Sequence, residues 1–164
     1  MKAIDQHALC LGTLFTNLQT LEFLLRLFLY KKRSRPHISF VRGQNLTGLR
    51  VGKVLPENAV TDYDSLGKLI RRYNATAVGK VHGLKITDDL VSLRDALAHG
   101  RVFVPKTGLP LQLLKFTKPR GKTVRVEFAA ALSLDWLEKQ STRVLAEITK
   151  VRAAMGSGRR YHRA

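Results

Sequence analysis

LGTLFTNLQTLEFLLRLFL, residues 11–29, predicts a long α-helix with one buried face. Its apolar residues recur at intervals of three and four, which is the spacing of one side of a helix. This stripe comprises Leu11, Leu14, Phe15, Leu18, Leu21, Leu25, Phe28 and Leu29. Other elements have to cover such a stripe, so we expect this helix to be a main part of the core.

The second half of this helix is apolar beyond the stripe. Additional apolar side chains lie on its other faces, namely Phe23, Leu24, Leu27 and Tyr30. This half is therefore either central among the helices or buried against another subunit, and a homodimer would account for it.

Polar residues argue against a membrane span. The apolar stretch is interrupted at helical intervals by Thr13, Thr16, Asn17, Gln19, Glu22 and Arg26. This pattern is typical of an amphipathic helix. Asp5 lies where a signal peptide would be basic, and the lone Cys10 cannot form an internal disulfide or a zinc site. We expect a cytoplasmic protein with no membrane contact, no metal and no cofactor.

Three further helices are expected downstream. The first begins after Asp62, and its inward residues are Leu66, Leu69, Ile70 and Tyr73. The next spans about residues 87–99 with Thr87 as its N-cap. Ser133 caps the last helix, whose apolar stripe continues to Met155.

Short strands are expected between the last two helices. Residues 102–104, 111–116 and 124–128 have the pattern of strands, and the turns between them contain Pro and Gly. They predict a β-hairpin or small meander at about residues 101–128. The expected fold is mainly α, a helical bundle of four or five helices with this basic β insertion before the last helix.

We expect one domain over residues 1–155 and a flexible basic tail over residues 156–164. Residues 37–60 are interpreted as an irregular excursion that opens with a β-like piece at residues 37–42.

The charge indicates an anionic partner. The chain has 164 residues, of which 29 are Lys or Arg and 12 are Asp or Glu, so its formal net charge is +17. Neutralising the phosphates of a nucleic acid releases their condensed counterions, which favours binding by such a protein. Nucleic acid is therefore the first candidate, and an anionic membrane surface is the second.

The hexapeptide Arg94-Asp95-Ala96-Leu97-Ala98-His99 carries the residue types of a metal-free ribonuclease. An arginine offers a fixed cation for phosphate oxygens, and a histidine can take or give a proton near neutral pH. On an ideal helix Asp95 and His99 are about 40° apart, whereas Arg94 lies about 140° from His99. One helix thus favours contact between Asp95 and His99, and a second copy of the chain could bring Arg94 to His99.

These six residues resemble the motif of the HEPN superfamily, in which a His follows an Arg by four to six residues, usually with a polar residue after the Arg. The resemblance covers this motif and the order of the long helices around it. It implies a helical domain that dimerises so that two motifs face one cleft, and metal-independent RNA cleavage in active members. Many relatives are toxins or defence effectors, which implies a neutralising antitoxin partner. Asp95 stands where active members often have Asn.

The implied chemistry assigns a role to each residue of the motif. His99 would deprotonate the ribose 2′-OH or protonate the leaving 5′-oxygen, and Arg94 would stabilise charge on the phosphate oxygens. Asp95 would orient the imidazole. The products would end in a 2′,3′-cyclic phosphate or a 3′-phosphate, and DNA should not be cleaved.

A block of basic residues follows the motif. Between residues 101 and 126 there is no acid, whereas a solvated hairpin normally mixes both signs of charge. We expect RNA phosphate contacts from seven cations, Arg101, Lys106, Lys115, Lys118, Arg120, Lys122 and Arg125.

The alternative is a nucleic-acid-binding protein without catalysis. It could be a degenerate relative of the HEPN proteins, or a winged helix-turn-helix protein that reads DNA with residues 87–99. About a dozen residues separate the second and third helices, where a helix-turn-helix has three or four. Asp88 and Asp89 at the start of the third helix would also repel phosphates.

Overall fold

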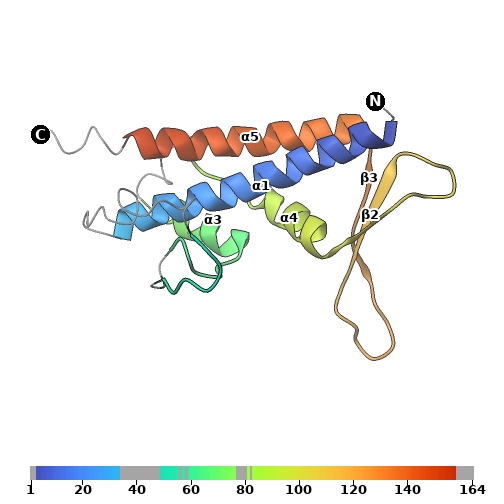
Figure 1. Cartoon of the computed structure of the whole chain (residues 1–164), viewed down its shortest axis with the longest axis horizontal. Coiled ribbons are helices and arrows are strands. Elements are labelled where there is room, and N and C mark those ends of the chain that lie inside the picture. Colours follow the sequence, from blue (N-terminus) through green and yellow to red (C-terminus); the bar gives the residue numbers. More distant parts are fainter. Residues whose placement is uncertain are drawn as a thin grey trace, which may run out of the picture.

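The computed structural model describes residues 3–33, 49–55, 57, 59–76, 81 and 83–157. Within these residues the chain is mainly α, as predicted, with four helices and one three-stranded antiparallel sheet (Figure 1). In chain order the elements are α1 (Ala3–Arg33), α3 (Leu66–Asn74), α4 (Asp89–His99), β1 (Arg101–Phe103), β2 (Leu111–Phe116), β3 (Val126–Leu132) and α5 (Leu134–Ser157).

The two long helices α1 and α5 lie side by side and run in the same direction (Figure 1). Helices α3 and α4 return along them, and the sheet projects from the end where α1 begins. The strands follow α4 in the chain and precede α5.

The apolar stripe of α1 forms the centre of the core. Leu14, Leu18, Leu21 and Leu25 are at most 1% exposed, and Phe28 packs edge-on against Tyr73 of α3 with ring centroids 4.8 Å apart. Phe15 is an exception to the predicted stripe, because 43% of it is exposed. It lies about 100° from Leu14 around the helix.

The helices that follow α1 begin close to their predicted positions. The Ser65 hydroxyl caps α3 by accepting from the Lys68 backbone N–H at 3.4 Å, and the Ser133 hydroxyl accepts from the Trp136 N–H at 3.2 Å. Leu66, Leu69, Ile70 and Tyr73 are buried as predicted. The predicted cap at Thr87 is wrong by one residue, because Asp88 occupies the N-cap position of α4.

The sheet is a meander with the strand order β1-β2-β3. The third strand begins and ends later than predicted, at residues 126–132 and not 124–128. It continues because Leu132 still pairs with Leu111 and has a fully buried side chain. Leu111 and Leu113 of β2 face the helices on the same side of the sheet.

Two predictions lie outside the described residues. The β-like piece at residues 37–42 is one of them, and most of the basic tail, residues 158–164, is the other. Residues 156 and 157 of that predicted tail belong to α5.

Gly100 joins α4 to β1 at a point where backbone and side chains approach closely. A Cβ at this position would lie 2.3 Å from the Ala96 carbonyl oxygen and 2.7 Å from Cδ1 of Leu113. Only glycine therefore lets the sheet begin directly after His99.

Gly100→Ala should destabilise the protein by about 1–3 kcal/mol, because the added methyl group overpacks the junction. Chemical denaturation of both proteins measures this change. Gly12→Ala is the matched control, because its Cβ would meet no atom within 4 Å and helical alanine is favoured over glycine by about 1 kcal/mol. Equal stability of Gly100→Ala and the wild type would contradict the close approach.

Candidate functional site

His99 and Asp95 are neighbours on one face of α4, as their spacing predicts. The distance between His99 Nε2 and Asp95 Oδ1 is 3.6 Å. The His99 side chain is 65% exposed, so solvent or a ligand can reach the imidazole. The end of α4 thus presents a histidine whose orientation a carboxylate can fix.

Lys115 of β2 binds the other oxygen of the same carboxylate. Its Nζ contacts Asp95 Oδ2 and also donates to Glu127 Oε2 of β3 at 2.6 Å. Hydrogen bonds from Lys115 to Asp95 and then to Glu127 raise the pKa of Lys115. The Asp95 carboxylate therefore joins the helix that carries His99 to the basic sheet.

Arg94 is directed toward α1. Its Nε donates to Glu22 Oε2 at 3.3 Å, and its side chain is 28% exposed. Among the described residues, no hydrogen bond or ion pair joins Arg94 to His99. This arrangement agrees with the angular separation of the two residues on α4.

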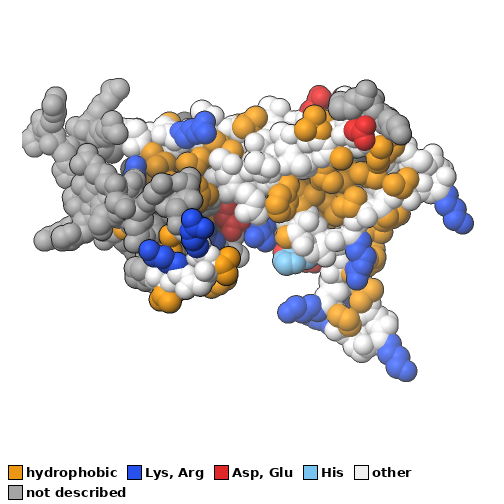
Figure 2. Space-filling view, viewed as in Figure 1, with side chains coloured by type: hydrophobic (Ala, Val, Ile, Leu, Met, Phe, Trp, Pro, Cys, Tyr) orange, Lys and Arg blue, Asp and Glu red, His pale blue; other side chains and the backbone are white. Residues whose placement is uncertain are grey.

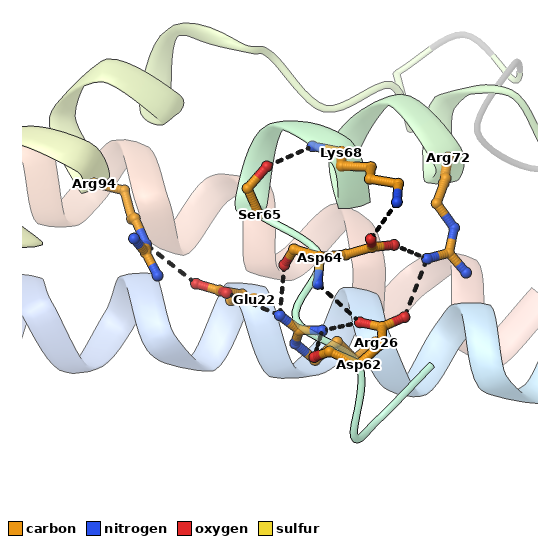
Figure 3. A network of polar contacts seen from close by, with 8 residues as sticks. All are labelled: Glu22, Arg26, Asp62, Asp64, Ser65, Lys68, Arg72 and Arg94. Atoms are coloured by element: carbon orange, nitrogen blue, oxygen red, sulfur yellow. Dashed lines mark hydrogen bonds and ion pairs between the residues drawn. The ribbon is translucent and has the colours of Figure 1, made fainter. Parts of the chain in front are cut away.

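Glu22 also belongs to a larger ionic network between α1, residues 62–65 and α3 (Figure 3). At its centre, the Arg26 guanidinium donates to Glu22 Oε1 at 3.1 Å, to a carboxylate oxygen of Asp62 and to the Asp64 carbonyl oxygen at 2.6 Å. Arg72 binds the carboxylates of Asp62 and Asp64. The side chains of Glu22, Arg26, Asp62 and Asp64 are no more than 16% exposed.

The sequence pattern does not predict this network. In the sequence, Glu22 and Arg26 stand out only as interruptions of an apolar stretch. Their spacing of four residues in the most apolar half of α1 was an available signal, because charges there need partners. The partners Asp62 and Asp64 are about forty residues away, and no local pattern identifies them.

Six of the seven predicted RNA-binding cations are exposed. Lys106 lies in the connection between β1 and β2, and Lys118, Arg120, Lys122 and Arg125 lie in the connection between β2 and β3. Arg101 lies on β1 with its guanidinium carbon 5.6 Å from the centre of the Phe116 ring. Within the described part of the chain none of these six forms an ion pair, whereas Lys115 forms two. Figure 2 shows Lys and Arg side chains at the tips of the projecting sheet.

Two further features bear on membranes and metals. Residues 3–31 of α1 are long and apolar enough to cross a membrane by length and composition alone, a test that core helices also pass. In the part of the chain that is described, no group of three or more His, Cys, Asp or Glu side chains could hold a metal ion.

Comparison with protein-family models, curated proteins and solved structures finds no match to this chain.

Arg26→Met should destabilise the protein by about 3 kcal/mol, because it leaves the buried Glu22 and Asp62 carboxylates without their shared cation. Chemical denaturation measures the loss. Arg152→Met on the exposed surface of α5 is the control and should change stability by less than about 0.5 kcal/mol. If Arg26→Met loses no more stability than Arg152→Met, the network does not stabilise the fold.

Asp64 gives the network a pH dependence. Hydrogen bonding by Lys68, and then by Arg72, lowers the pKa of Asp64 against the opposing effect of burial. Its ionised form therefore stabilises the fold above the unfolded pKa of about 4, and this contribution is lost as the pH falls through the folded pKa. The stability difference between wild type and Asp64→Asn should shrink as the pH is lowered below about 4. Denaturation curves at several pH values measure it, and a constant difference would contradict the assignment.

Proposed function

We propose that this protein is a metal-independent endoribonuclease whose site forms at a homodimer cleft. The observation that supports it best is the contact of His99 with Asp95 at an exposed helix end, which one residue separates from a basic sheet. The resemblance of residues 94–99 to the HEPN motif points to the same chemistry.

The proposed reaction uses the RNA's own nucleophile. His99 takes the proton of a ribose 2′-OH, and the 2′-oxygen attacks the adjacent phosphorus. The bond from phosphorus to the 5′-oxygen breaks, and the His99 imidazolium formed in the first step donates its proton to that leaving oxygen. The products are a 2′,3′-cyclic phosphate and a 5′-hydroxyl. Asp95 orients the His99 ring and stabilises its protonated form.

A second copy of the chain supplies the missing arginine in this proposal. Within one chain Arg94 is directed toward Glu22 and away from His99, so an Arg94 from the other copy is the candidate cation for the phosphate oxygens near His99. Phe23 follows Glu22 on α1 and is 40% exposed. A second copy packed over this part of α1 would cover that ring and lie close to Arg94.

The proposed setting follows from the same resemblance. The helices would form a HEPN-like bundle over residues 1–155, with the sheet as an insertion before α5. The protein would act in the cytoplasm without a membrane or a cofactor, as a toxin or defence effector that an antitoxin neutralises.

A non-catalytic nucleic-acid-binding protein is the second candidate. The ion pair of Arg94 with the buried Glu22 favours it, because this pair gives Arg94 a structural role. The winged-helix form of this candidate has less support. Helix α3 ends at Asn74 and α4 begins at Asp89, and α4 would approach DNA with Asp88 and Asp89 first.

Cleavage of a labelled single-stranded RNA in the presence of a chelator tests the proposal. We expect the wild type to leave cyclic phosphate ends. His99→Ala should lower the cleavage rate by at least about 100-fold through loss of acid-base catalysis. Arg94→Ala should lower it by about 100-fold through loss of charge stabilisation.

Arg152→Ala is the control for Arg94, because Arg152 is an exposed arginine on α5. Its cleavage rate should equal that of the wild type. If a folded wild type binds RNA or DNA and cleaves neither, the nuclease proposal is wrong and the non-catalytic candidate replaces it. Binding of duplex DNA in preference to RNA would favour the winged-helix form.

A further inference from the structure

The sheet has one face against the helices and one face toward solvent. Leu111, Leu113 and Leu132 are buried on the inner face. Cross-strand pairs share a face, and Arg101 pairs with Leu114 while Phe103 pairs with Gln112. The outer sheet face is therefore formed by Arg101, Phe103, Gln112, Leu114 and Phe116, with Ala129 and Ala131 of β3 beside them.

Flat side chains lie in a row along this outer sheet face. The Arg101 guanidinium lies over the Phe116 ring at 5.6 Å, and Phe103 follows Arg101 by two residues on β1, a rise of about 7 Å. The Phe103 ring is 43% exposed. On the far side of β2, Ala131 and Ala129 of β3 pair with Gln112 and Leu114, and Val126 pairs with Phe116.

Exposed cations border this row at both ends of the sheet. Lys106 lies at one turn, and Lys118, Arg120 and Lys122 lie at the other. Figure 2 shows this distribution, with hydrophobic side chains along the sheet and Lys and Arg side chains at its tips. Flat groups between cations match the chemistry of a nucleic acid strand, in which bases alternate with phosphates.

We propose that the outer sheet face binds single-stranded RNA by base stacking. One base stacks on the Phe103 ring and another on the pair formed by Arg101 and Phe116, while the turn cations contact the phosphates. A duplex keeps its bases stacked on one another, so it can use only the cations. This inference rests on the proposed function for the choice of RNA as the ligand, and it adds a recognition surface beside the His99 site.

Charge decides between RNA and a second copy of the chain as the occupant. The exposed cations around this face would repel the same face of a second copy, whereas they attract a polyanion.

A short 2′-O-methyl oligouridine is the probe, because it lacks the 2′-OH that cleavage requires and so reports binding alone. Fluorescence anisotropy gives its dissociation constant for the full-length protein. The double variant Phe103→Leu/Phe116→Leu should bind it at least tenfold more weakly, because stacking is lost while apolar volume and charge are kept. The dependence of binding on salt should not change, because no phosphate contact is removed.

Phe15→Leu is the matched control, because this ring on α1 is as exposed as the Phe103 ring, at 43%. Its affinity for the probe should equal that of the wild type. A duplex RNA should bind the wild type and Phe103→Leu/Phe116→Leu equally. Light scattering on each protein measures whether the substitutions alter the oligomeric state.

Equal probe binding by Phe103→Leu/Phe116→Leu and the wild type would overturn the inference, even if the wild type cleaves RNA. An equal loss of affinity for the single-stranded probe and for duplex RNA would also overturn it, because base stacking would then not be involved. A change of oligomeric state confined to this variant would assign the face to a second copy. If stacking is confirmed and no RNA is cleaved, the inference stands and the nuclease proposal fails.

Discussion

Burial of the leucine stripe of α1 is the constraint on which the other elements depend. Four of its leucines are almost fully inaccessible, and burying each one stabilises the fold by about 1.5–3 kcal/mol relative to leaving it in water. The long helix α5 covers most of this stripe, and α3 and α4 cover the remainder. Because α1 and α5 run in the same direction, the chain has to return between them, and α3 and α4 form that return path (Figure 1).

The charges on α1 then determine how this return path is attached. Arg26 lies in an apolar environment that would make an isolated cation costly, and Glu22, Asp62 and Asp64 surround it. The same Glu22 binds Arg94 of α4, so one carboxylate connects two helices. This connection holds Arg94 on one side of α4, whereas His99 and Asp95 lie on another side of the same helix.

The sheet extends this site on the other side. Gly100 permits an immediate turn from α4 into β1, and Lys115 ties the sheet to Asp95. The basic turns and the flat side chains of the outer sheet face therefore follow His99 directly in the chain. The proposed action on RNA rests on this combination of a histidine and a carboxylate with a neighbouring surface of cations and aromatic rings.

The sequence by itself determined the helices and their buried faces, because apolar periodicity and capping residues act over a few neighbouring positions. It also determined the contact of Asp95 with His99, because four residues make one turn of a helix. The exposure of Phe15, the longer third strand and the ionic network around Arg26 were decided by the tertiary structure. They depend on which distant residues cover each surface. The same holds for Lys115, which belongs to the predicted basic block and yet binds Asp95 and Glu127, because strand register sets its partners.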